Sequence, residues 1–191
     1  MSFILFTGGV RSGKSKLAQA WTEAAAEERL LLATCHPADA EMAHRIAAHQ
    51  KSRDSSWRCL EEPLELVGGL RLFRERTPDF AGSLLIDSVG MWIANLMAQN
   101  LAAKEILRRM RALAAALDSQ ELPCAIVSEE CGLGLVPPNP VARKFGDLIG
   151  VANQILAQKA HAVIFVACGL PLALKGSVPA VLDRIIHGYR Q

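Results

Sequence analysis

The sequence has no dominant charge, because 21 Lys and Arg residues stand against 19 Asp and Glu residues, a formal net charge of +2. No basic run accompanies this small excess, so we expect no binding to nucleic acid. A long apolar run is also missing: the stretch from Ala162 to Leu174 is interrupted by Gly169 and Pro171 and is too short to span a bilayer. The first seven residues lack the basic region and cleavage site of a signal peptide. We therefore expect a soluble chain without membrane insertion.

Paired cysteines are absent as well. The five cysteines are scattered and never form a Cys-x-x-Cys pair, which argues against a disulfide framework and a zinc site. We expect a reducing cytoplasm as the location and a role for most of these residues as small buried hydrophobes. They are Cys35, Cys59, Cys124, Cys131 and Cys168.

Composition and pattern predict one α/β domain over residues 1–191. A hydrophobic content of 51% with 21% charged residues is typical of a globular chain of this length. Short runs that are apolar throughout indicate strands of a parallel sheet buried on both faces, and helical patterns alternate with them. The predicted strands are Phe3–Thr7, Leu30–Thr34, Ser83–Asp87, Cys124–Ser128 and Ala162–Ala167. The predicted helices are Lys14–Glu28, Ala38–Arg53, Met91–Gln99, Ala103–Leu117, Val141–Ala160 and a tail helix within Ser177–Gln191.

One glycine-rich motif carries specific chemistry. Residues 8–15 read Gly-Gly-Val-Arg-Ser-Gly-Lys-Ser and match the phosphate-binding loop (P-loop) between a predicted strand and a predicted helix. Its glycines let backbone N–H groups surround phosphate oxygens, while Lys14 reaches the β- and γ-phosphates and Ser15 ligates Mg²⁺. The alternative is a glycine-rich turn with an exposed lysine. The motif predicts a P-loop NTPase-type (RecA-like) fold, a mostly parallel sheet with helices on both faces. The nucleotide-binding residues it implies are Gly8, Gly9, Val10, Arg11, Ser12, Gly13, Lys14 and Ser15.

Three further features fit a phosphate-handling site. Asp87 closes an apolar strand, where a carboxylate holds Mg²⁺ or, alternatively, caps the next helix. Arg45, His49 and Arg53 share one face of a predicted helix, which suits either an imidazole attacking phosphorus between two guanidiniums or an ordinary amphipathic helix. The irregular segment 129–140 follows a strand, at the ligand-binding end of an open α/β sheet, or is a plain connector.

Taken together, the motifs resemble a known family, the bifunctional adenosylcobinamide kinase / adenosylcobinamide-phosphate guanylyltransferase of cobalamin biosynthesis. The resemblance covers roughly residues 3–175. It rests on an ordered series of matches: the P-loop at 8–15, Arg45-x3-His49-x3-Arg53, Trp57, Glu61-Glu62-Pro63-Leu64, Asp87 with Trp92 and Asn95, Gly132-Leu133-Gly134, Val136-Pro137, Asn139, Ala142-Arg143, Asp147, Asn153-Gln154, and Gly169-Leu170-Pro171 near Lys175.

The resemblance implies two reactions. ATP or GTP phosphorylates the hydroxyl of adenosylcobinamide, and GMP then passes from GTP through a histidine to give adenosylcobinamide-GDP. His49 matches that histidine, so His49 and Lys14 are the expected catalytic residues, with Ser15 and Asp87 at Mg²⁺. Further nucleotide-contacting positions implied by the resemblance are Ala33, Thr34, Cys35, Gln50, Lys51, Ser52, Arg53, Glu61 and Asp87. From the residues alone, Glu61 and Glu62 are interpreted as charges at the N-terminus of a helix, where they are favourable to its dipole. We also expect a homo-oligomer.

Three positions depart from the family pattern: Glu129 replaces an asparagine, Pro138 replaces a glutamate, and Gly90 replaces a common threonine. If the loop contacts the corrinoid, the first two changes affect substrate affinity. Two other functions stay open. One is a different P-loop kinase for a small metabolite, and the other is a nucleotide-dependent regulatory protein without transferase activity.

Overall fold

The computed structural model describes residues 3–35 and 54–188. Within these residues one seven-stranded sheet has the order β3-β2-β4-β5-β1-β6-β7, in which β7 pairs antiparallel with β6 and the other pairs are parallel. The strand bounds are β1 Ile4–Gly8, β2 Arg29–Ala33, β3 Trp57–Glu61, β4 Ser83–Asp87, β5 Cys124–Glu129, β6 Ala162–Ala167 and β7 Leu170–Lys175.

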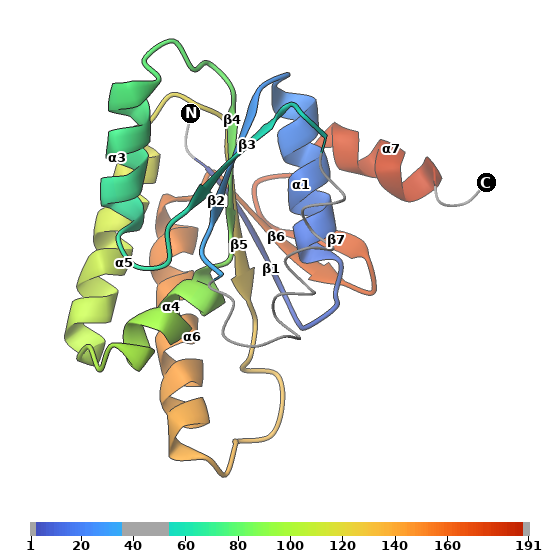
Figure 1. Ribbon diagram of the computed structural model, residues 1–191. Helices are drawn as coiled ribbons and strands as arrows, with labels where there is room; N and C mark the ends of the chain where they lie inside the picture. Colours follow the sequence, from blue (N-terminus) through green and yellow to red (C-terminus); the bar gives the residue numbers. More distant parts are fainter. Residues whose placement is uncertain (1–2, 36–53, 189–191) are drawn as a thin grey trace.

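Helices cover both faces of this sheet, as Figure 1 shows. On one side lie α1 (Lys14–Ala25) and α7 (Ala180–Gly188), and on the other α3 (Leu66–Arg76), α4 (Val89–Ala98), α5 (Ala103–Asp118) and α6 (Pro140–Lys159). Strand side chains alternate between two buried clusters. In β1, Ile4 and Phe6 pack with Leu17 of α1, whereas Leu5 packs with the other cluster, which includes Trp92. The predicted α/β fold is confirmed.

Three elements were not predicted. Strands β3 and β7 lie at the two edges of the sheet, where burial is partial and the all-apolar pattern used to recognise strands is lost. Pro171 in β7 fits such an edge position. Helix α3 contains Gly68 and Gly69, which weaken a helical pattern. The predicted helix Ala38–Arg53 lies outside the described residues, apart from which the predicted elements are present with end shifts of a few residues.

The expectation of mostly buried cysteines was wrong. Only Cys124 is buried, whereas Cys59, Cys131 and Cys168 are exposed and Cys35 is half-buried. Cys124 lies in the interior strand β5, and burial raises its pKa to about 12. The exposed cysteines lie in the edge strand β3 or in loops, where side chains are not enclosed between layers. None of the five cysteines forms a disulfide. Within residues 3–35 and 54–188, no helix has the length and apolar character needed to cross a membrane.

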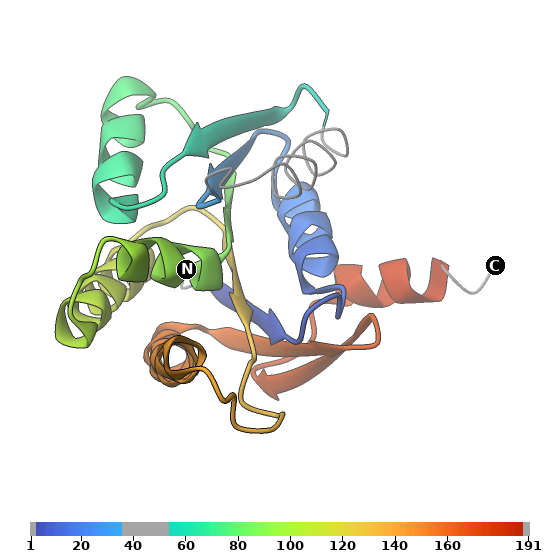
Figure 2. The same ribbon diagram turned by 60° about the horizontal axis from the view of Figure 1, so that its bottom comes forward.

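The parallel strands end on the same side of the sheet, and this end carries most of the expected site residues. The loop after β1 and the loop between β5 and α6 both leave the lower end of the sheet in Figure 1, and Figure 2 turns that end forward. Gly8 at the end of β1 is in register with Glu129 at the end of β5. Strand β5 in turn lies between β1 and β4, which ends at Asp87.

Candidate nucleotide site

The phosphate loop adopts a backbone that favours an anion. Arg11 and Gly13 both have left-handed backbone angles, with φ of 56° and 95°. Helix α1 begins directly afterwards at Lys14, without a side-chain cap and without an acidic residue in its first turn. The N–H groups at the start of a helix carry a partial positive charge. Since no side chain of the helix neutralises it, this end of α1 suits a phosphate.

The hairpin between β6 and β7 packs against the phosphate loop. Gly169 in the hairpin turn donates its N–H to the carbonyl oxygen of Ser12 at 2.8 Å. A Cβ atom added at Gly13 would lie 3.3 Å from the Cα of Gly169, and one added at Gly8 would lie 2.3 Å from the carbonyl oxygen of Val166. The glycines of the motif therefore allow close contact with the neighbouring hairpin as well as with a ligand.

The polar side chains of the loop fit phosphate oxygens. Lys14 is 8% exposed, and its Nζ donates to the carbonyl oxygen of Gly9 at 3.3 Å. The hydroxyl groups of Thr7 and Ser12 are buried, and neither has a hydrogen-bond partner among the described residues. A buried hydroxyl without a partner is costly, and phosphate oxygens would satisfy such groups. Val10, by contrast, is an exposed side chain of the loop.

Ser15 and Asp87 come together as the sequence predicts for a magnesium site. The Ser15 hydroxyl donates to a carboxylate oxygen of Asp87 at 3.5 Å, which joins the start of α1 to the end of β4. Hydroxyl and carboxylate oxygens are suitable Mg²⁺ ligands, and Mg²⁺ takes its remaining ligands from water and phosphates. The part of the chain that the structure describes has no group of three or more His, Cys, Asp or Glu side chains that could hold a metal. The alternative role of Asp87 as a helix cap is filled by Ser88, which accepts from the N–H of Met91 at 3.4 Å.

Three expected nucleotide-contacting residues lie side by side on neighbouring strands. Ala33 of β2 is in register with Glu61 of β3 on one side and Asp87 of β4 on the other. Cys35 follows two residues after Ala33, and burial together with the charge of Asp87 raises the pKa of its thiol. These residues extend the site from the phosphate loop along the carboxyl ends of the strands.

Thr34 has a different environment. It is fully buried, and its hydroxyl donates to the carbonyl oxygen of Ser88 at 2.7 Å and accepts from the N–H of Ser88 at 2.9 Å. The side chain is thus used to join β2 to the turn that follows Asp87. Its contribution to the site is to hold this turn in place.

The predicted nucleophile His49 and the residues around it, Arg45, Gln50, Lys51, Ser52 and Arg53, lie outside the described residues. Of the glutamate pair, Glu61 ends β3, whereas Glu62 accepts hydrogen bonds from the N–H groups of Leu64 and Glu65 just before α3. The helix-terminal interpretation therefore applies to Glu62.

Two asparagines of the motif series form hydrogen bonds to the backbone near the carboxyl ends of the strands. Asn95 donates to the carbonyl oxygens of Thr34 at 2.7 Å and Pro63 at 3.2 Å. Asn153 of α6 donates to the carbonyl oxygen of Glu129 at 2.9 Å and accepts from the hydroxyl of Ser128. No role for these side chains could be predicted from the sequence, because an amide on a helix bonds to backbone groups that only the fold brings near it.

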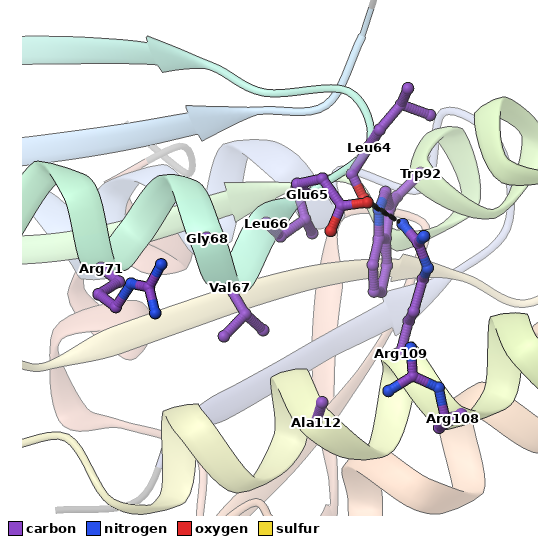
Figure 3. Close-up of a pocket in the computed structure, with 10 residues that line it drawn as sticks. All are labelled: Leu64, Glu65, Leu66, Val67, Gly68, Arg71, Trp92, Arg108, Arg109 and Ala112. Atoms are coloured by element: carbon purple, nitrogen blue, oxygen red, sulfur yellow. Dashed lines mark hydrogen bonds and ion pairs between the residues drawn. The ribbon is translucent and has the colours of Figure 1, made fainter.

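A pocket on the face of the sheet that α3, α4 and α5 cover contains none of the expected site residues. It lies between the start of α3 and α5, as Figure 3 shows, and Trp92 forms part of its wall. Arg109 donates to the carbonyl oxygen of Leu64 and to Glu65, and Trp92 donates to the same carbonyl at 2.9 Å. These contacts hold the segment before α3 rather than leave groups open to a ligand.

Known proteins match the chain over nearly its whole length. A family model described as "Cobinamide kinase / cobinamide phosphate guanyltransferase" matches residues 4–174. A bifunctional adenosylcobalamin biosynthesis protein of Pseudomonas aeruginosa, CobP, is 38% identical over 90% of this chain and 96% of its own length. The proteins named CobU of Salmonella typhimurium and Escherichia coli are 34% and 32% identical, each over 90% of this chain and 99% of its own length. The chain belongs to the cobinamide kinase / cobinamide phosphate guanyltransferase family.

Proposed function

We propose that the protein catalyses two successive reactions of adenosylcobalamin biosynthesis. It phosphorylates adenosylcobinamide with ATP or GTP and then transfers GMP from GTP to the product, giving adenosylcobinamide-GDP. The observation that carries this proposal is the convergence of Lys14, Ser15 and Asp87 at one end of the sheet, in a chain that belongs to the family. This geometry suits a triphosphate, which both reactions consume.

In the kinase step, the substrate hydroxyl oxygen forms a bond to the γ-phosphorus while the bond from that phosphorus to the β-γ bridging oxygen breaks. The nucleoside diphosphate leaves, and the hydroxyl proton is released to water. Lys14 and the N–H groups at the start of α1 bind the phosphate oxygens whose charge changes during transfer. Ser15 and Asp87 would hold Mg²⁺, which when bound neutralises charge on the β- and γ-phosphates.

In the guanylyl transfer step, His49 is the proposed nucleophile. Its ring nitrogen forms a bond to the α-phosphorus of GTP, and pyrophosphate leaves. An oxygen of the substrate phosphate then attacks the same phosphorus, the nitrogen–phosphorus bond breaks, and the imidazole is regenerated. The phosphate loop would bind the departing pyrophosphate. Arg45 and Arg53, one helical turn to either side of His49 in the predicted helix, would neutralise the α-phosphate. Gln50, Lys51 and Ser52 complete the proposed contacts of this segment.

The surroundings of the enzyme follow from the same reasoning. We propose one domain over residues 1–191, a homo-oligomer, and a cytoplasmic location. Cysteines that form no disulfides support a location in a reducing compartment, and the small net charge supports an absence of nucleic-acid partners. The partners are then the small-molecule substrates alone.

The proposal is tested by labelling the protein with GTP that carries radioactive phosphorus at the α-position. We expect an acid-labile covalent label in the wild type, none in His49→Ala, and a normal label in the matched control His44→Ala. His49→Ala should still phosphorylate adenosylcobinamide and accumulate the monophosphate, because the attacking group in that step is the hydroxyl of the substrate.

Each other outcome identifies a different error. If the label survives in His49→Ala but disappears in His44→Ala, the nucleophile is His44 and the proposed histidine is wrong. A wild type that turns over ATP with a different small alcohol and never acquires label would be another P-loop kinase. Nucleotide binding without turnover of any corrinoid would indicate a regulatory protein.

A further inference from the structure

The side chain of Glu129 is engaged at the start of α4. Its two carboxylate oxygens accept separate hydrogen bonds, one from the hydroxyl of Ser88 at 2.8 Å and one from the N–H of Gly90 at 2.9 Å. Ser88 is the N-cap residue of α4, and Gly90 lies in its first turn. A carboxylate at this end of a helix satisfies N–H groups that have no partner within the helix and opposes their partial positive charge. Glu129 therefore caps α4 from another strand.

Gly90 provides the space that this carboxylate occupies. A Cβ atom added at Gly90 would lie 2.1 Å from Oε2 and 2.8 Å from Cδ of Glu129, and the next nearest atom, in the ring of Phe145, is 3.4 Å away. Gly90 is part of a helix, where alanine is normally favoured over glycine. An added Cβ at this position would displace the end of the Glu129 side chain, whereas the backbone angles of Gly90 are ordinary helical ones.

The capped corner carries the candidate magnesium ligand. Asp87 ends β4 and immediately precedes Ser88 and α4. Glu129 ends β5, in register with Gly8 at the start of the phosphate loop. The contact of Glu129 with Ser88 and Gly90 thus joins β5, the strand beside β1 and the phosphate loop, to the turn that follows Asp87. The hydrogen bond from Ser15 to Asp87 lies between these same two parts of the site.

We propose that Glu129 is a positioning residue that fixes the Asp87 corner relative to the phosphate loop, and that Gly90 is its matched partner. The part of this inference that concerns Mg²⁺ rests on the proposed function of Asp87. The coupling between Glu129 and Gly90 rests on the contacts alone.

A double-mutant cycle tests the coupling in Mg²⁺-free buffer. Gly90→Ala should displace the carboxylate and lower the thermal unfolding midpoint by about 3–8 °C. Glu129→Ala should lower it by a similar amount, because each variant removes the same pair of charge-assisted hydrogen bonds. In the Glu129→Ala background, Gly90→Ala should be neutral or stabilising, since only the helix preference for alanine remains. Gly150→Ala in α6, whose added Cβ has no atom within 4 Å, is the matched control. Equal effects of Gly90→Ala in both backgrounds would overturn the coupling.

A second measurement tests positioning. We expect Glu129→Ala to raise the Mg²⁺ concentration for half-maximal turnover of GTP about tenfold, with Glu129→Gln intermediate because it keeps one acceptor oxygen. A purely structural cap would lower the unfolding midpoint and leave the Mg²⁺ requirement unchanged, which would overturn the positioning role. If the wild type itself needs no Mg²⁺, the proposed role of Asp87 fails, whereas the cycle in Mg²⁺-free buffer still decides whether Glu129 and Gly90 are coupled.

Discussion

The phosphate loop and the β5–α6 loop leave the same end of the sheet from neighbouring strands, yet they are held very differently. An added Cβ at Gly8 would meet a backbone oxygen at 2.3 Å, whereas one at Gly134 would meet nothing within 4 Å. Residues 131–139 are all exposed, including Leu133, Leu135 and Val136. Packing thus requires glycine at Gly8, whereas no contact requires it at Gly134. The close contact at Gly8 holds the backbone of the phosphate loop against the neighbouring strand, and no such contact holds the backbone at Gly134.

Of substitutions in the two loops, the largest loss of activity is expected at Lys14. Lys14→Ala should reduce both kinase and guanylyl transfer activity by about 10²–10³-fold, because both reactions use one set of groups that bind the triphosphate. Initial rates with each substrate measure this loss, and the exposed Lys104→Ala in α5 serves as control. Full guanylyl transfer by Lys14→Ala would mean that a second nucleotide site exists.

A second comparison concerns stability. Gly8→Ala should lower the free energy of unfolding by about 1–3 kcal/mol, since the added methyl group collides with the carbonyl oxygen of Val166, a backbone atom of an interior strand. Gly134→Ala should change it by less than about 0.5 kcal/mol. Urea unfolding of the two variants measures the difference. Similar stabilities would show that the hairpin can move away from the phosphate loop.

The smallest effect is expected from the exposed apolar residues. Leu135→Ser should leave the unfolding free energy within about 0.5 kcal/mol of the wild type, because the side chain is 98% exposed. If the loop contacts the corrinoid, the variant should raise the KM for adenosylcobinamide phosphate about threefold, the equivalent of less than 1 kcal/mol, without changing that for GTP. An unchanged KM for the corrinoid would place the substrate elsewhere.

Hydrogen bonds hold the β5–α6 loop where it enters α6. Arg143 donates to the carbonyl oxygens of Pro137 and Pro138 at 2.9 and 2.7 Å, and Asn139 caps α6 by accepting from the N–H of Val141 at 2.8 Å. These contacts hold the segment where it enters the helix. Leu133 and Leu135 lie before this segment, and their side chains are exposed and apolar, so they form no hydrogen bonds that could hold them.

How far the sequence predicts the structure depends on the range of the contacts involved. The interior strands and the P-loop were predicted because runs such as Leu84–Ile86 and the spacing of Gly8, Gly13 and Lys14 are local signals. The pairing of Ser15 with Asp87 also followed, because Asp87 ends one strand and Ser15 begins the helix that follows another, so both lie at the same end of the sheet. Strand β3 was missed because only Trp57 and Leu60 of its five residues are even partly buried.

The contact between Gly90 and Glu129 shows what local signals omit. Each residue was recognised as unusual, but nothing in the spacing of positions 90 and 129 indicates that one carboxylate fills the space of the other residue's missing side chain. The same holds for Asn95 and Asn153, whose partners are backbone carbonyls of Thr34, just after β2, and of Glu129, at the end of β5. Such groups are identified only when the packing of helix on sheet is known.

The bond between Gly169 and Ser12 also has a consequence for the order in which the site is assembled. The phosphate loop leaves the ribosome well before the hairpin that supports it, since residues 8–15 precede β6 and β7, the last of which ends at Lys175. Contacts between residues so distant in sequence form late in folding, after the loop-closure entropy has been overcome. An incomplete chain would therefore carry every residue of the nucleotide motif and still lack a formed nucleotide site, so premature release yields an inactive fragment rather than a nucleotide-trapping one.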